Sequence, residues 1–453
     1  MIIKRTQNCL FENDVLQYES LVKEFTDKNF DEFDDIAKSL SLSEKIDNLI
    51  SGKIINASEN KAAFHPRYRS YEKYEQTNKN FINAETKSIE FFNNCCNYCN
   101  DQGYDKVNII TLGIGGSYEG PKLLLDSINS PISNKKITKN LAFNFDFITG
   151  SDPHEFRIKT KLLLPENTFF IVSSKSFTTD ETIENLKKAF AWSGDKNKFI
   201  AITANPKEAK KYGFENVIYF DEEIGGRYSI WSPITQFHLW GDKRDDFFKG
   251  GQKADIDIVE NDKYLNFVKR LSFSDIFLNN KGKNARAILS YIWKLRSLPD
   301  YFQQLEMESL GKRANPNSHY KNTGQIIFGG YGPTAQHSYF QLLHQGTQNI
   351  STDIISTKEE QESLAFAQAI TQSKLLASGE FEKQLDNESM INGNVPVNLF
   401  LLRKFNPFSL GFLIATWEYR TFITATILGI NPFDQFGVNA GKIYTKRYLA
   451  DNN

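Results

Sequence analysis

The chain has 453 residues, and its 54 lysines and arginines nearly balance its 55 aspartates and glutamates, for a formal net charge of −1. Hydrophobic residues make up 40% of the chain and aromatic residues 13%, which excludes a disordered chain and is enough for about two or three domain cores. The balanced charge, with no long block of one sign, argues against a dedicated nucleic-acid-binding protein.

The segments that could target the chain or insert it into a membrane lack the necessary features. Residues 1–20 have neither the apolar region nor the small-residue cleavage site of a secretory signal. The most apolar stretch, residues 410–430, carries Glu418 and Arg420 near its middle, so it predicts a buried core helix rather than a membrane span. We therefore expect a soluble, globular, cytoplasmic protein.

Four cysteines in a chain of this length are too few for a disulfide scaffold. Three of them, Cys95, Cys96 and Cys99, lie close together in a polar helical pattern. A metal or redox site at Cys96 and Cys99 would need further ligands, and no second cysteine or histidine pair accompanies them. We expect ordinary buried thiols, with no metal and no cofactor.

Strand and helix patterns alternate over residues 84–240. Short apolar runs predict five strands, at 107–112, 143–149, 168–172, 199–203 and 217–220. A leucine-rich helical stretch follows the first strand, Asp152 and Pro153 predict a helix start after the second, and a helix over 180–192 follows the third. This alternation is typical of a parallel sheet with helices on both faces.

From about residue 262 the pattern is more helical, but it contains a second alternating unit. Strand-like segments occur near 301–307, 325–329 and 352–355, and two long helices near 409–427 and 437–449 end the chain. The sequence therefore predicts an α/β fold of two sandwich domains with parallel sheets and long C-terminal helices. We expect a smaller domain at 80–245, and a larger one at 1–79 and 246–453 with N-terminal helices and a C-terminal helical arm.

Two of the predicted strand ends carry groups suited to an anion. Residues 113–117 (GIGGS) supply glycines and a hydroxyl, and residues 173–182 supply six hydroxyls and Lys175. Ligands of open α/β sheets bind beyond the carboxyl ends of the strands, where helix N-termini attract anions. A phosphate monoester fits better than a dinucleotide, because neither the G-x-G-x-x-G nor the P-loop spacing is present. Taken singly, each segment is more often a plain capped helix start.

Two further segments could supply catalytic groups. The glycines before Arg227 permit close backbone approach, and its guanidinium could stabilise developing negative charge, unless it is an ordinary surface arginine after a turn. In the predicted strand near 301–307, Glu306 and Glu308 would point the same way, so one could be buried with a raised pKa and act as a base. Acidic residues on a solvated strand face are the simpler alternative.

His337 and Lys442 are weaker candidates when each is considered alone. His337 follows a predicted strand and a glycine turn at a helix start, and His344 follows on the same predicted helix. No histidine spacing indicates a zinc site. Lys442 lies on the last predicted helix, where a solvated lysine is the ordinary alternative.

In their order along the chain, these segments resemble the phosphoglucose isomerase family. The motifs that carry the resemblance span nearly the whole chain: NKAAFH at 60–65, GIGGS at 113–117, SKSFTT at 174–179, GGRYSIW at 225–231, QLEMES at 304–309, GPTAQH at 332–337, LGFLIATWEY at 410–419 and FDQFGVNAGK at 433–442. The resemblance implies two sugar-isomerase-type domains, a homodimer, and interconversion of glucose 6-phosphate and fructose 6-phosphate in glycolysis and gluconeogenesis.

The resemblance also implies a role for each candidate residue. Glu308 is expected to move a proton between C1 and C2 of the open-chain sugar, Arg227 to stabilise the cis-enediolate, and His337 and Lys442 to open the ring. The hydroxyls expected to hold the phosphate are those of Ser117, Ser174, Ser176, Thr179 and Thr182. The residues expected to line the site are Gly116, Lys175, Gln304 and Gln435. Each site is expected to be composite, with His337 reaching across the dimer to the other subunit.

The chain departs from the usual family pattern at a few places. Asn439 replaces a glutamate, Lys61 replaces an arginine, Ser176 replaces a threonine, and Leu310 stands where asparagine is usual. None of these changes removes a group with a direct chemical role, although Asn439 removes a carboxylate near Lys442.

Two other functions remain as alternatives. A non-catalytic sugar-phosphate sensor on the same fold would have no need to keep Glu308, His337, Arg227 and Lys442 together. A glutamine-dependent aminosugar-forming isomerase would need a glutaminase domain with an N-terminal cysteine, whereas Cys9 lies too far inside the chain.

Overall fold

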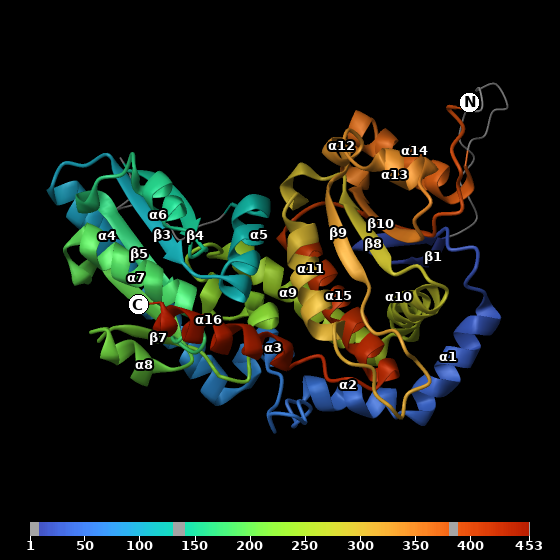
Figure 1. The fold of residues 1–453 in the computed structure, drawn as a ribbon, viewed down its shortest axis with the longest axis horizontal. Helices are drawn as coiled ribbons and strands as arrows, with labels where there is room; N and C mark the ends of the chain where they lie inside the picture. The colour runs from blue at the N-terminus through green and yellow to red at the C-terminus, as the bar shows by residue number, and fades with distance from the viewer. Residues whose placement is uncertain (1–8, 130–140, 380–387, 453) are drawn as a thin grey trace. The chain divides into compact units, whose positions relative to one another are not determined.

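The computed structural model describes residues 9–129, 141–379 and 388–452 (Figure 1). The chain forms two compact units: Phe64–Lys249, called here the inserted unit, and Met1–Ala63 with Gly250–Asn453, called the terminal unit. Within the described ranges, none of the helices has the combination of length and hydropathy needed to cross a bilayer. The first eight residues of the segment assessed above for a secretory signal lie outside the described ranges.

The inserted unit is built on a five-stranded parallel sheet in the order β4-β3-β5-β6-β7. Its strands are β3 (Lys106–Leu112), β4 (Ala142–Ile148), β5 (Thr168–Ser173), β6 (Phe199–Thr203) and β7 (Val217–Tyr219). Its helices are α3 (His65–Arg69), α4 (Glu75–Asp101), α5 (Glu119–Ser127), α6 (Pro153–Thr160), α7 (Asp180–Ser193) and α8 (Pro206–Lys211). The five strands and the parallel sheet predicted from the sequence are confirmed.

The order of the strands marks where this sheet can bind a ligand. After β3 the chain forms its neighbour β4 on one side and then β5 on the other, so the direction of winding reverses between β3 and β5. Such a reversal leaves a crevice beyond the carboxyl ends of the two strands, because the connecting helices go to opposite faces. The loops that follow β3 and β5 are the two segments predicted to bind phosphate.

The three clustered cysteines lie on α4 and are buried free thiols, as predicted. Burial raises the pKa of Cys96 to about 12 and that of Cys99 to about 11. Thiols with raised pKa values are poor nucleophiles and poor metal ligands, because the reactive form is the thiolate.

The terminal unit is built on a six-stranded sheet in the order β1-β2-β11-β10-β8-β9. Its strands are β1 (Cys9–Glu12), β2 (Leu16–Ser20), β8 (Ala285–Ser290), β9 (Ile326–Tyr331), β10 (Ile350–Thr357) and β11 (Val397–Leu402). Its helices are α1 (Asp27–Ser39), α2 (Leu42–Ile50), α10 (Asp262–Asn280), α11 (Leu298–Leu310), α12 (Gly332–Ala335), α13 (Phe340–Gln345), α14 (Leu364–Ser378), α15 (Pro407–Leu428) and α16 (Asn439–Asp451), and the boundary with the inserted unit falls within α9 (Asp242–Glu260).

The two long C-terminal helices are confirmed, and the N-terminal segment contains the helices α1 and α2, preceded by two strands that were not predicted. β1 and β2 form an antiparallel hairpin, and β2 continues the sheet by pairing antiparallel with β11, so that Tyr18 lies opposite Phe400. The sequence prediction missed β1, β2, β8 and β11. The pairing partner of β2 lies hundreds of residues away, and local pattern carries no information about it.

The segment near 301–307, predicted as a strand, is part of the helix α11, so that prediction is wrong. The buried side chains include Phe302, Leu305, Glu306 and Ser309, which recur at intervals of three and four residues, as on one face of a helix. Glu306 made this helical spacing hard to recognise in the sequence, because a carboxylate is normally expected on the surface and not at a core position.

Successive side chains along each strand of the terminal sheet point to its two opposite faces. One face packs on α13 and α14 in an apolar cluster that includes Leu289, Leu343 and Leu376. The other face carries Arg286 and Asp353 toward α10, α11 and α15.

A buried charge network ties that second face together. The guanidinium of Arg286 pairs with Asp275 of α10 and Glu306 of α11, and its Nε lies 3.2 Å from Asp353 of β10. Arg420 of α15 donates two hydrogen bonds to Asp275, at 2.7 and 2.8 Å, and one to Asp353 at 2.8 Å. Buried charges are tolerated only when they are paired in this way.

Candidate active site

The loop after β5 presents hydroxyl groups at the start of α7. Ser174 is buried, its Oγ lies 3.2 Å from Oγ1 of Thr179, and it accepts a hydrogen bond from the backbone N–H of Phe177. Phe177 has a positive φ of 55° and is held in that conformation by complete burial of its ring. Thr179 is the N-cap residue of α7, and its side chain makes no capping bond. The N–H groups that begin this 14-residue helix can therefore bind an anion.

The loop after β3 lies against the segment that carries Arg227. Oγ of Ser229 donates to the carbonyl oxygens of Gly116, at 3.2 Å, and Gly226, at 2.7 Å. A Cβ atom on Gly116 would lie 1.8 Å from the carbonyl oxygen of Gly226, so only glycine permits this approach. The contact sets the buried Arg227, next to Gly226, beside the first predicted phosphate loop.

The predicted residues of the inserted unit therefore gather at the carboxyl edge of β3 and β5. Beyond those described, Ser117 and Thr182 are buried, Lys175 is half-buried and Ser176 is exposed. The arrangement offers hydroxyls, a helix N-terminus and a guanidinium, which together suit the dianion of a phosphate monoester.

In the terminal unit, the two glutamates of α11 lie in different surroundings, contrary to the prediction that they share a strand face. Glu306 is buried, and it accepts hydrogen bonds from Arg286 and, at 2.7 Å, from Nε1 of Trp417. Burial raises the pKa of Glu306, and the positive charges of Arg286 and Arg420 oppose that shift. Its place in the charge network makes it a structural carboxylate.

Glu308 is half-buried and lies on another side of α11 from Glu306. Residues that are two positions apart in a helix are separated by about 200° around its axis. Nε2 of Gln304, one turn earlier and also half-buried, donates to Oε2 of Glu308 at 3.2 Å. The structure thus brings together two of the predicted site residues and fixes the carboxylate in one rotamer. A positioned carboxylate of this kind suits proton abstraction next to a carbonyl group.

His337 follows α12 and is exposed, whereas His344 lies on the separate helix α13, so the two do not share the helix predicted for them. A tight turn, with the N–H of His337 donating to the carbonyl oxygen of Thr334 at 3.0 Å, interrupts the helix between them. Both histidines line a pocket of about 370 Å³, where Nε2 of His344 lies 2.9 Å from Oε1 of Gln372.

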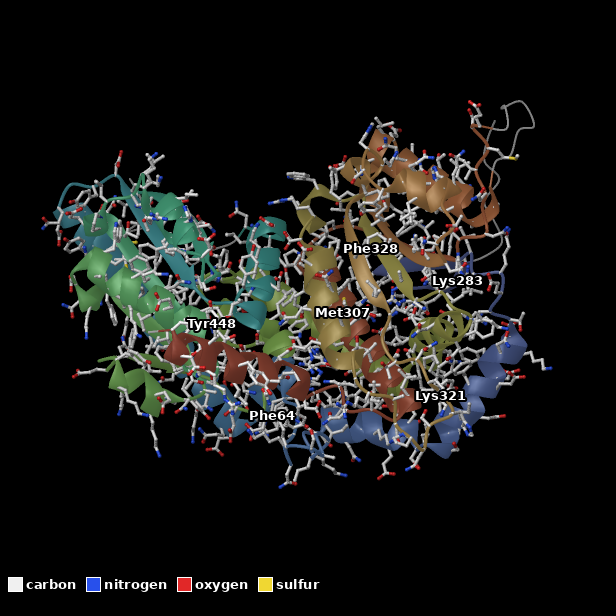
Figure 2. The ribbon with its side chains drawn as sticks, in the orientation of Figure 1. Phe64, Lys283, Met307, Lys321, Phe328 and Tyr448 are labelled. Atoms are coloured by element: carbon white, nitrogen blue, oxygen red, sulfur yellow. The ribbon has the colours of Figure 1, made fainter. Side chains whose placement is uncertain are left out.

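His337 and Glu308 of one chain lie on opposite faces of the terminal sheet. The N–H of Ile327 on β9 donates to Sδ of Met307, and Ile327 pairs with Arg286, which faces α11. The next residue, Phe328, faces the other way and packs against the ring of Tyr339 at 5.4 Å, close to His337. Figure 2 labels Met307 on α11 and Phe328 on β9.

Gln435 and Lys442 lie in the last part of the terminal unit, and both are exposed. Gln435 follows the buried residues Phe433 and Asp434, and Lys442 is the fourth residue of α16. No residue of α16 is buried, and the turn that precedes it contains the buried residues Phe433 and Asp434.

The predicted site residues thus fall into two sets, one in each unit. Sequence reasoning missed Arg286. Its ion pair with Glu306 identifies Glu306 as a structural residue and leaves Glu308 as the candidate base of α11. An arginine within an otherwise apolar strand, ARAILS, is the feature that could have indicated a buried partner. Among the described residues, no group of three or more histidine, cysteine or acidic side chains is arranged to hold a metal ion.

A protein-family model described as phosphoglucose isomerase matches residues 21–452 of this chain. Among curated proteins, a glucose-6-phosphate isomerase from Legionella pneumophila is 34% identical over 432 residues, which cover 90% of this chain and 84% of that protein. One from Marinomonas is 32% identical over 461 residues, covering 90% of this chain and 82% of that protein.

Solved structures show the same fold. A glucose-6-phosphate isomerase from Chlamydia trachomatis superposes with a TM-score of 0.79 at 22% identity, covering 98% of this chain and 92% of that one. A hypothetical protein from Thermus thermophilus superposes with a TM-score of 0.67 at 19% identity, covering 92% and 97%.

Proposed function

Because the chain belongs to the phosphoglucose isomerase family, we propose that it interconverts glucose 6-phosphate and fructose 6-phosphate. The observation that carries the proposal is the family match over residues 21–452, which includes every predicted site residue. The geometry of the two units supports the proposed activity, since the inserted unit offers a phosphate-binding site and the terminal unit offers a positioned carboxylate.

The reaction assigns a separate task to each group. His337 and Lys442 open the ring, one acting on the ring oxygen and the other on the C1 hydroxyl. Glu308 then takes the proton from C2 of the aldose and returns it to C1, through a cis-enediolate whose negative charge Arg227 stabilises. The reverse reaction uses the same groups in the opposite order.

The phosphate of the substrate occupies the crevice beyond β3 and β5. The start of α7 and the hydroxyls of Ser174, Ser176 and Thr179 supply donors, and Ser117 and Thr182 complete the seat. Lys175 and Gly116 line it from the two loops. Backbone N–H groups at a helix start favour a dianion, so the site selects phosphorylated sugars over free ones.

Each active site is composite in a homodimer. The opposite-face placement of His337 and Glu308 supports this arrangement, because the two groups of one chain then lie on different sides of its sheet. A two-fold axis makes the exchange reciprocal, so each site takes His337 from one chain and Glu308 from the other.

Two further expectations accompany this function as proposals. The inserted and terminal units correspond to the smaller and larger sugar-isomerase domains, and the protein works in the cytoplasm. The sugar-phosphate sensor remains the alternative that a functional assay must exclude.

A coupled assay tests the proposed function. Fructose 6-phosphate is supplied, and a dehydrogenase specific for glucose 6-phosphate reports product through reduction of its nicotinamide cofactor. We expect saturable turnover with the wild-type chain and loss of that turnover with Glu308→Gln. Tight binding of fructose 6-phosphate without turnover would identify a sensor and refute the enzyme.

A further inference from the structure

Lys312 and Asp434 join the end of α11 to the turn that precedes Gln435 and α16. Lys312 follows Glu308 by four residues. Its ammonium donates to the main-chain oxygen of Asp434 and lies 3.0 Å from Oδ1 of the same residue. The Lys312 side chain is 17% exposed and that of Asp434 is 11% exposed, so the pair is largely shielded from water.

Both partners are fixed by further hydrogen bonds. The carbonyl oxygen of Lys312 accepts from Oγ1 of Thr323 at 2.8 Å. The second carboxylate oxygen of Asp434 accepts from Oγ of Ser58 at 2.6 Å and from Nδ2 of Asn431 at 3.0 Å. A shielded ion pair that is held on both sides keeps one geometry, unlike an exposed pair between mobile side chains.

The helix that follows this turn, α16, carries Lys442. Every residue of α16 is exposed, and the chain is anchored just before it by Asp434 and by Phe433, whose ring packs 6.1 Å from that of Phe422 on α15. The ion pair between Lys312 and Asp434 therefore links the turn before Lys442 to the end of the helix that carries Glu308.

We propose that Lys312 and Asp434 are positioning residues, which hold the segment carrying Gln435 and Lys442 in register with the helix carrying Glu308. The inference rests on the proposed function, because it concerns the geometry between ring opening at Lys442 and proton transfer at Glu308. Both residues belong to the terminal unit, so we expect their loss to affect the chemical steps more than phosphate binding.

The test compares Lys312→Met with two matched variants. Lys312→Arg keeps a cationic donor, and Lys283→Met removes a similarly buried lysine of the terminal unit, which pairs with Glu24 at 3.7 Å and is labelled in Figure 2. Because a displacement of about 1 Å in a catalytic group can cost about 100-fold, we expect Lys312→Met to lower kcat about 10- to 100-fold. KM should change less than about threefold, Lys312→Arg should recover most of kcat, and Lys283→Met should leave it unchanged.

A second measurement separates positioning from loss of folding. Asp434→Asn keeps the side-chain shape and the main-chain oxygen that Lys312 binds, so it should lower kcat less than Lys312→Met does, and its Tm is measured beside kcat. The proposal is overturned if kcat of Lys312→Met equals that of Lys283→Met, or if all the variants lose kcat in proportion to Tm.

The Glu308→Gln background distinguishes failure of this proposal from failure of the proposed function. In that background we expect no isomerisation, while exchange between the anomers of glucose 6-phosphate, measured by NMR, continues and slows when Lys312→Met is added. Normal isomerisation by Glu308→Gln would refute the assignment of the base. Undiminished anomer exchange in the double variant would refute the positioning pair and leave the base in place. If Glu308→Gln shows no anomer exchange, the kcat comparison alone decides.

Discussion

His238 is a buried histidine that makes the inserted unit sensitive to acid. It is 1% exposed, and its ring stacks on that of Phe147 with centroids 5.1 Å apart. Its Nε2 lies 3.4 Å from Oγ1 of Thr111, and its Nδ1 has no hydrogen-bond partner among the described residues. A proton added to this ring would be buried without an acceptor, so the folded chain resists protonation.

The size of the effect follows from the two pKa values. Burial lowers the pKa of His238 from 6.5 to about 3. Below pH 6.5 the unfolded chain therefore takes up a proton that the folded chain refuses, so the free energy of unfolding decreases as the pH falls. For this group alone, linkage gives a loss of about 2 kcal/mol between pH 7 and pH 5, and a limit of about 5 kcal/mol below pH 3.

The prediction is measured by urea unfolding of the wild type, His238→Gln and the control His319→Gln, which changes an exposed histidine. Between pH 7 and pH 5 the wild type and the control should lose about 2 kcal/mol more than His238→Gln loses. The comparison of slopes removes the contribution of all other titrating groups and any constant cost of the substitution. Equal pH slopes in all three proteins would refute the reasoning.

Four further predictions concern the active site. Glu308→Gln should lower kcat at least about 100-fold in the coupled assay while fructose 6-phosphate still binds, because the base is lost and the shape is kept; full activity would exclude Glu308 as the base. Ser176→Ala combined with Thr179→Ala should raise KM about 10-fold and weaken inhibition by inorganic phosphate, since two donors are lost, and an unchanged KM would place the phosphate elsewhere. Activity should survive a chelator, and loss that added zinc reverses would contradict the scheme in which Arg227 supplies the positive charge at the enediolate. Glu308→Ala and His337→Ala, each nearly inactive, should regain about a quarter of wild-type activity when they are refolded together in equal amounts. If no activity returns although mass measurement confirms mixed dimers, His337 acts in the site of its own chain.

The inserted unit was the more predictable part of the fold. A strand such as β5 is buried along its whole length, so its apolar run TFFIVS is visible without knowledge of its neighbours. The helix start at Asp152 was equally visible, because its carboxylate accepts a local capping hydrogen bond from the N–H of His154. Where the interactions that fix an element are local, sequence reasoning located that element within a few residues.

The terminal unit was less predictable because its elements depend on distant partners. Glu306 occupies a core position of α11 only because Arg286 and Trp417 supply its hydrogen bonds. The motifs identified Glu308 as a candidate. Only the structure shows that this segment is a helix, which turns the side chains of Glu306 and Glu308 in different directions. The opposite-face placement of His337 likewise depends on the register of β9, which no local pattern contains.

The buried charge network also has a consequence for how the terminal unit folds. Its two arginines and three carboxylates come from α10, β8, α11, β10 and α15, so its members are spread from Asp275 to Arg420 along the chain. A partly folded chain that lacks α15 would bury Asp275 and Asp353 without Arg420, and uncompensated buried charge is strongly destabilising. Intermediates that contain the sheet but not α15 are therefore disfavoured. Because the network is complete only when its long-range contacts have all formed, we expect this unit to fold slowly and cooperatively.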